Sequence, residues 1–165
     1  MTYTQATDLK APKSEPSPTK VCFVCTGNTC RSPMAMAVLN SLGKGKYSAV
    51  SAGIMAAKGS PINEKAATAL LNKGINSTED NNYLSHQAQQ LNMGIMESCD
   101  LIVGVGAGHA MMILQYFPIF ASKITSFDSP ITDPFGGTQE EYDKCLSDII
   151  EAVKSKFALT EGEGQ

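Results

Sequence analysis

The chain has 165 residues and a formal net charge of −3, and charged residues make up 18% of it. This length suits one domain with a buried core, and the sparse, mildly acidic charge excludes the broad basic footprint of a nucleic-acid-binding protein. The five cysteines, with no apolar leader and no membrane-length apolar run, indicate a reduced cytoplasmic protein without nucleic-acid or membrane partners, which we expect to be a monomer.

The two ends of the chain differ from its middle. Residues 1–19 carry three prolines among Ser, Thr, Lys and Glu without helical or strand periodicity, which predicts a disordered N-terminal extension. Residues 158–165 are similarly polar and glycine-containing, and they predict a flexible C-terminal tail. The sequence therefore predicts a single folded domain over residues 20–157.

Within this domain, short β-rich runs alternate with helical periods. Such alternation is typical of an α/β fold in which helices cover both faces of a parallel sheet. We expect a three-layer α/β/α architecture with a four-stranded parallel sheet. The predicted strands cover residues 20–25, 47–52, 100–105 and 123–127.

Helix signals follow the first two strands. Ser32 is expected to be the N-cap of the first helix, with Pro33 at the first helical position, and Gly43 marks its end. A second helix is predicted over residues 60–74, where Ser60-Pro61 marks the start and Gly74 the end in the same way. Both helices would pack apolar side chains against the sheet.

Three further helices are expected in the second half of the chain. Two weaker ones are predicted over residues 86–98 and 108–117, the second ended by Pro118. The last has the clearest signal, because Thr138 and Glu141 form a capping-box pattern ahead of an apolar stripe. That stripe must pack on the sheet.

A candidate anion site follows the first strand. Cys25 ends this strand, and Arg31 comes six residues later, beside the expected helix start. A loop that enters a helix N-terminus presents unpaired N–H groups and a partial positive charge, which bind phosphate-like anions without a metal and also stabilise a thiolate. We predict Cys25 as the nucleophile and Arg31 as the oxyanion-binding group. The expected phosphate-binding residues are Thr26, Gly27, Asn28, Thr29, Cys30 and Arg31, of which Gly27 and Asn28 tolerate a left-handed backbone.

A general acid is expected on a later loop. Asp133 follows the fourth predicted strand, and Pro134 restricts its backbone to extended values, so the carboxyl group would be held at the same sheet edge as Cys25. Asp133 would protonate the leaving atom and then deprotonate water. Phe135 is predicted to form an apolar wall, and the Ser32 hydroxyl to stabilise the Cys25 thiolate.

The run from Cys25 to Pro33, with Ser51-Ala52-Gly53 and Asp133-Pro134-Phe135, resembles the low-molecular-weight protein tyrosine phosphatases over nearly all of residues 20–157. The resemblance implies a four-stranded parallel sheet, phosphorylated protein substrates, a cysteinyl-phosphate intermediate, and no metal or other cofactor. It assigns Cys25 as the nucleophile, Arg31 as the oxyanion binder and Asp133 as the general acid. Asn28 would shape the loop, and Ser32 would bond the thiolate. Cys30 would form a redox-protective disulfide with the nucleophile.

The substrate is expected to be phosphotyrosine or phosphoarginine. Thr29 stands where eukaryotic members of the family carry a bulky aliphatic residue, and a smaller hydroxylated side chain suits a planar guanidinium. With Phe135 as the second selectivity residue, the motifs resemble the bacterial branch that includes protein-arginine phosphatases. Two features depart from the family pattern: Met36 replaces a common Glu, and residues 54–57 lack an aromatic wall.

The main alternative is a thioredoxin-coupled arsenate reductase of the same fold. Such enzymes need two further cysteines close together on a mobile segment, whereas this chain offers only Cys99 there, and Cys145 falls in the last helical stripe. Strand alternation is expected to turn Cys22 to the opposite face from Cys25, which favours a core position for Cys22. Cys99 and Cys145 are also expected in the core. The two histidines, at positions 86 and 109, are separated and lack partner ligands, so neither is expected to bind a metal. For His109, which could lie near the cavity rim, a surface or helix-capping role is expected.

Overall fold

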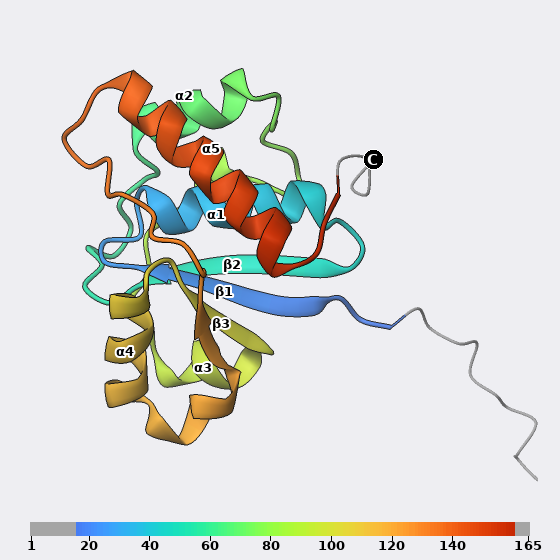
Figure 1. Cartoon of the computed structure of the whole chain (residues 1–165), viewed down its shortest axis with the longest axis vertical. Coiled ribbons are helices and arrows are strands. Elements are labelled where there is room, and N and C mark those ends of the chain that lie inside the picture. The colour runs from blue at the N-terminus through green and yellow to red at the C-terminus, as the bar shows by residue number, and fades with distance from the viewer. Residues whose placement is uncertain (1–15, 161–165) are drawn as a thin grey trace, which may run out of the picture.

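The computed structural model describes residues 16–160 and has a parallel four-stranded sheet at its centre (Figure 1). The strand order is β2-β1-β3-β4, which confirms the expected fold class. The tails predicted over residues 1–19 and 158–165 lie largely outside the described residues. The strands are β1 (Thr19–Cys25), β2 (Tyr47–Gly53), β3 (Leu101–Gly104) and β4 (Ile124–Ser126).

Helices cover both faces of this sheet (Figure 1). Helices α1, α2 and α5 lie on one face, where α5 contacts both α1 and α2, and helices α3 and α4 lie on the other, beside β3 and β4. The three-layer α/β/α prediction is therefore confirmed. The helices are α1 (Arg31–Leu42), α2 (Glu64–Asn72), α3 (Met93–Ser98), α4 (Ala107–Tyr116) and α5 (Gln139–Lys156), with 3₁₀ turns η2 (Tyr83–Ser85) and η3 (Pro118–Lys123).

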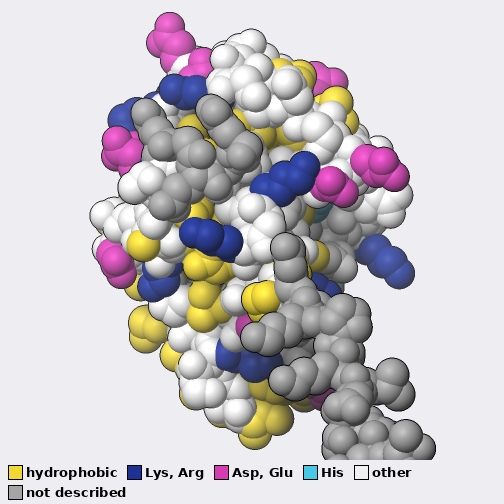
Figure 2. Space-filling view, turned by 90° about the vertical axis from the view of Figure 1, so that its right-hand side faces the viewer, with side chains coloured by type: hydrophobic (Ala, Val, Ile, Leu, Met, Phe, Trp, Pro, Cys, Tyr) yellow, Lys and Arg dark blue, Asp and Glu magenta, His cyan; other side chains and the backbone are white. Residues whose placement is uncertain are grey.

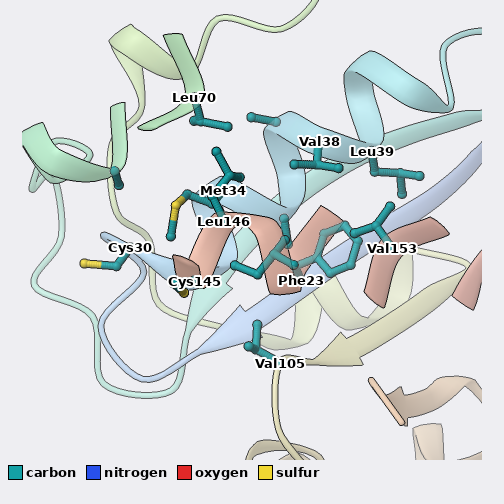
Figure 3. Packing of buried hydrophobic residues seen from close by; sticks show 14 of the residues in the cluster. Phe23, Cys30, Met34, Val38, Leu39, Leu70, Val105, Cys145, Leu146 and Val153 are labelled. Carbon is teal, nitrogen blue, oxygen red and sulfur yellow. The ribbon is translucent and has the colours of Figure 1, made fainter. Parts of the chain in front are cut away.

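Strand β1 divides the core into two clusters. Side chains alternate along a strand, so Phe23 and Cys25 join the cluster beneath α1, α2 and α5, while Cys22 joins the cluster beneath α3 and α4. Phe23 is fully buried and packs among Met34, Leu146 and other apolar side chains (Figure 3). The prediction that Cys22 and Cys25 point to opposite faces is confirmed.

The strand order also positions Cys25. The chain moves from β1 to β2 on one side and then crosses to β3 on the other side of β1. The carboxyl end of β1 is therefore a topological switch point, where open parallel sheets bind their ligands. Cys25 is the last residue of this strand.

The first helix begins differently from the expectation. Its N-cap is Cys30 rather than Ser32, and no side chain caps it. The Ser32 hydroxyl cannot cap the helix because Cys25 and Asn28 already engage it. The helix N-terminus consequently stays open toward the loop that precedes it.

Two other helices are shorter than predicted. Helix α2 begins at Glu64 instead of near Ser60, because the Asn63 side chain accepts hydrogen bonds from the next turn and acts as the cap. Most of the helix expected over residues 86–98 is extended, and only α3 is helical. The extended part bonds Gly53 at the end of β2, which uses backbone groups that a helix would need.

The last helix confirms its sequence signal. Thr138 accepts a hydrogen bond from the Glu141 backbone, and the Glu141 carboxylate accepts one from Thr138. The apolar stripe of α5 is buried against the sheet and α1. This cap fixes where the loop from β4 ends, and that loop carries Asp133.

The face at the amino-terminal ends of the strands carries charges of both signs. Figure 2 shows lysine side chains on this face, with acidic side chains around them. Among residues 16–160, no helix combines the length and apolar character needed to cross a lipid bilayer.

Candidate active site

A cavity of about 230 Å³ opens at the carboxyl end of β1. The structure brings the predicted site residues together there, although Asp133 is 108 positions away from Cys25 in the chain. The lining consists of Cys25, Thr26, Gly27, Asn28, Thr29, Cys30, Arg31, Asp133 and Phe135.

The scaffold holds the carbonyl groups of the Cys25–Arg31 loop from outside. The Cys25 and Thr26 carbonyls accept backbone N–H groups from the segment after β2, at distances of 3.0 and 2.9 Å. The Thr29 carbonyl accepts the Asn63 backbone N–H at 2.9 Å, and the Asn28 carbonyl accepts a histidine ring N–H. With these carbonyls tied to the scaffold, the loop can turn its N–H groups toward the cavity.

Those N–H groups have no acceptor in the part of the chain that the structure describes. Within residues 16–160, none of the backbone N–H groups from Thr26 to Arg31 donates a hydrogen bond. The buried Nε of Arg31 also lacks a partner among these residues. Buried donors in folded proteins are nearly always satisfied, so this ring of free donors is the signature of a site for an anion.

Asn28 shapes the loop from within. It is fully buried and has a left-handed backbone with φ of 59°. Its amide nitrogen donates to Ser32 Oγ at 2.8 Å and to Ser51 Oγ at 2.9 Å, and its Oδ1 accepts the Gln89 backbone N–H at 3.0 Å. Gly27, in contrast, does not use positive φ; its missing side chain leaves room in the cavity.

Replacing Asn28 tests this role. Asn28→Ala is expected to lower the free energy of unfolding by about 3 kcal/mol, because it leaves buried partners unpaired and places an alanine at positive φ. Asn28→Gly is the matched control, since glycine removes the hydrogen bonds but accepts the backbone conformation. Urea unfolding should place the glycine variant between wild type and the alanine variant; equal stability of all three would contradict the role.

Ser32 lies against the thiol of Cys25. The distance between Ser32 Oγ and Cys25 Sγ is 2.9 Å, and both residues are buried. Because Ser32 Oγ already accepts a hydrogen bond from Asn28, its own proton is available for the sulfur. The geometry allows the Ser32 hydroxyl to donate a hydrogen bond to Cys25 Sγ.

Asp133 reaches the cavity from the loop after β4. Its Oδ2 lies 3.4 Å from an Arg31 guanidinium nitrogen, and its Oδ1 accepts the Phe135 backbone N–H at 3.1 Å. The Asp133 side chain is 55% exposed, whereas that of Arg31 is only 11% exposed. One carboxylate oxygen is thus held by its own loop while the other faces the anion site. Phe135 is 76% exposed at the cavity rim.

Cys30 is the second thiol at the loop. Its Sγ lies 3.5 Å from the hydroxyl oxygen of Tyr142 and points away from the Phe23–Leu146 part of the core (Figure 3). Burial raises the pKa of the Cys30 thiol, and the hydrogen bonds from Tyr142 and Thr29 only partly offset this. The Cys30 thiol is therefore protonated at neutral pH.

Several supporting residues were missed in the sequence. His86 Nε2 donates to the Asn28 carbonyl at 2.7 Å, and His109 Nε2 contacts Thr26 Oγ1 at 3.2 Å, so both histidines touch the loop. Ser51 donates to the Met36 sulfur at 3.5 Å. The expected helix-capping role of His109 is confirmed, since its ring accepts the Gly106 backbone N–H, whereas the contacts of both histidines with the loop could not be predicted from their distant positions in the sequence.

Comparison with known proteins extends this description. Residues 20–162 match the model of the family described as low molecular weight phosphotyrosine protein phosphatase. A protein-arginine-phosphatase of Geobacillus stearothermophilus is 34% identical over 86% of this chain and 95% of its own length. A probable low molecular weight protein-tyrosine-phosphatase, EpsP, of Ralstonia solanacearum is 32% identical over 81% of this chain and 90% of its own length.

A solved structure agrees with these sequence matches. The YwlE arginine phosphatase from Geobacillus stearothermophilus superposes with a TM-score of 0.74 at 32% identity, covering 86% of this chain and 94% of that one.

Proposed function

This chain belongs to the low molecular weight phosphotyrosine protein phosphatase family. We propose that it hydrolyses phosphorylated protein side chains through a cysteinyl-phosphate formed on Cys25. The chain is a protein phosphatase. The observation that carries the mechanism is the set of free N–H groups, with the unpartnered Arg31 Nε, around the sulfur of Cys25.

The first step transfers the phosphoryl group to sulfur. The N–H groups of the Cys25–Arg31 loop and the Arg31 guanidinium bind the phosphate oxygens, and Cys25 Sγ attacks phosphorus in line with the leaving atom. The sulfur–phosphorus bond forms as the bond to the leaving atom breaks. Protonated Asp133 gives its proton to that atom, which departs as a phenol or a guanidinium side chain.

The second step returns the free enzyme. Asp133, now a carboxylate, takes a proton from water, and the water oxygen attacks phosphorus. The sulfur–phosphorus bond breaks, and the electron pair returns to Cys25 Sγ. The Ser32 hydroxyl stabilises this departing thiolate across 2.9 Å. Inorganic phosphate then leaves the loop.

Aryl phosphate turnover in the presence of a metal chelator tests this chemistry. Release of the phenol without added metal is expected, because the protein donors supply all of the charge stabilisation. An inactive wild type would contradict the phosphatase function, and activity only with thioredoxin and arsenate would support the reductase alternative. Neither further thiol that could serve such a relay lines the cavity, since Cys99 lies in the cluster on the other face of the sheet and Cys145 is buried in α5.

For the substrate, we favour phosphoarginine over phosphotyrosine. Thr29 lines the cavity and is only partly buried, and its hydroxyl makes just a 3.7 Å contact with the Cys30 sulfur, so it remains able to bond a guanidinium nitrogen. Phe135 supplies a planar apolar face at the rim. The 34% identical protein-arginine-phosphatase adds to this preference.

Thr29→Ile tests the preference. We expect the ratio of kcat/KM for a phosphoarginyl protein to that for a phosphotyrosyl peptide to fall by about tenfold, because the substitution adds bulk and removes the hydroxyl. Thr29→Val is the matched variant, since it removes the hydroxyl at nearly constant volume. An unchanged ratio in Thr29→Ile would rule out Thr29 as a selectivity residue.

We also propose that Cys30 protects the nucleophile. Hydrogen peroxide oxidises the Cys25 thiolate to a sulfenic acid; the Cys30 thiol then attacks that sulfur, water leaves and a disulfide forms. Mass spectrometry after peroxide treatment should detect the Cys25–Cys30 disulfide in wild type. A Cys30→Ser variant should instead accumulate irreversibly oxidised Cys25.

A further inference from the structure

His109 is the titratable group near the cavity to which the proposed mechanism gives no role. It lies in the first turn of α4, and its half-buried ring connects that helix to the loop that follows Cys25. Each ring nitrogen takes part in one hydrogen bond. Nε2 lies 3.2 Å from Thr26 Oγ1, and Nδ1 accepts the Gly106 backbone N–H at 3.1 Å.

These contacts define one tautomer of the ring. The Gly106 backbone N–H can only donate, so Nδ1 must accept and carries no proton. The proton of neutral His109 is therefore on Nε2, which donates it to Thr26 Oγ1. If the ring takes up a second proton, Nδ1 loses its lone pair, and two N–H groups face each other at Gly106. The protonated ring therefore loses its bond from Gly106, which fixes the ring at the start of α4, while Nε2 keeps its proton.

Electrostatics favour the neutral ring. Burial lowers the pKa of His109 below its ordinary value of 6.5, and Arg31 lowers it further, while Asp133 acts in the opposite direction. Helix α4 adds no charged side chain of its own, and the contact across from it is the uncharged Thr26. His109 is therefore mainly neutral at pH 7, and it takes up a proton at a lower pH than an ordinary histidine.

Thr26 links this ring to phosphate binding. It directly follows Cys25 and lines the cavity, and its carbonyl is already held by the Met55 backbone N–H at 2.9 Å. The bond from His109 adds a second attachment, on the side chain. Together they hold the first peptide N–H of the phosphate-binding loop in place.

We propose that His109 is a positioning residue whose neutral ring, fixed by its bond from Gly106, holds Thr26 in the phosphate-binding loop, and that proton uptake breaks the Gly106 bond, so that the ring moves, Thr26 loses this attachment and phosphate binding weakens. The inference rests on the proposed function of the Cys25 site. It does not depend on the choice between phosphotyrosine and phosphoarginine.

The test compares His109→Ala with His109→Gln between pH 5 and 8. Glutamine at the third position of a helix can accept the N-cap N–H, as in a capping box, and its amide can donate to Thr26 without titrating. At pH 7.5, we expect His109→Ala to lower kcat/KM for an aryl phosphate by about three- to tenfold, the effect of one ordinary hydrogen bond, and His109→Gln to restore it. Below pH 6, wild type should lose activity relative to His109→Gln.

Three controls sharpen this result. Substrate ionisation is the same for every variant, so the activity ratio of wild type to His109→Gln isolates the ring. Thr26→Val removes the acceptor, and His109→Ala added to it should cause no further loss. Met111→Ala changes an exposed residue of the same helix and should behave as wild type.

Binding of inorganic phosphate, measured by calorimetry with the same variants, separates this inference from the proposed function. A wild type that binds phosphate with the expected pH dependence but hydrolyses no aryl phosphate would overturn the function and leave the role of His109 standing. An active wild type whose activity ratio to His109→Gln is constant across pH would overturn the role of His109. The same conclusion would follow if His109→Ala were as active as wild type.

Discussion

Replacing Cys25 with serine is expected to reduce turnover of aryl and protein phosphates by about 10⁴-fold or more, a loss of the size seen when an enzyme's nucleophile is removed. A serine hydroxyl is far harder to deprotonate than a thiol, and Arg31 and the loop N–H groups stabilise a thiolate much better than they can generate an alkoxide. Steady-state assays at a high concentration of the variant, with substrate still in excess, measure the residual rate.

Phosphate binding should survive the same substitution. The donors that hold the anion belong to the backbone from Thr26 to Arg31 and to the Arg31 side chain, which Cys25→Ser leaves intact. Cys99→Ser is the matched control, because it changes another buried thiol that lies outside the cavity. Full activity in Cys25→Ser, or loss of activity in a folded Cys99→Ser, would contradict the assignment of the nucleophile.

The second large effect is expected at Asp133. Asp133→Asn should lower kcat by about 10²- to 10⁴-fold for phenyl phosphate, the usual contribution of a general acid. The loss should be much smaller for an aryl phosphate with a strongly acidic phenol, because that leaving group departs without a proton. A plot of kcat against leaving-group acidity for wild type and variant measures the difference.

Two comparisons make this experiment decisive. Asp128→Asn changes an acidic residue in the same inter-element loop that pairs with Lys156 instead of Arg31, and it should retain wild-type activity. Inorganic phosphate should bind Asp133→Asn at least as tightly as wild type, because a carboxylate 3.4 Å from Arg31 is removed. An equal loss for all leaving groups would exclude Asp133 as the acid and leave it a role in positioning Arg31.

The chemistry-bearing residues could be found in the sequence because local rules place them. Cys25 ends an apolar strand and Arg31 begins a helix, so their separation along the chain already defines a loop of anion size. The order of the strands then brings the carboxyl ends of β1 and β4 to one edge of the sheet, and Pro134 limits where Asp133 can point.

The supporting residues could not be found in this way. His86 and Gln89 reach Asn28 only because the segment after η2 runs extended along the end of β2, where a helix was expected. That segment is extended because Gly53 offers backbone hydrogen bonds to it, a tertiary contact that leaves no periodic pattern. Ser32 was predicted both to cap α1 and to contact Cys25; only the second holds, because the helix begins at Arg31 and the Ser32 hydroxyl turns back across the loop to Cys25.

The loop around Cys25 is shaped by Asn28, Ser51, His86 and Asn63 before any anion arrives. A ring of donors that needs no rearrangement to hold a substrate's phosphoryl group holds free inorganic phosphate on equal terms. The product, inorganic phosphate, is therefore expected to compete with each new substrate for the same binding site. Turnover of protein substrates is then expected to fall as the concentration of inorganic phosphate rises.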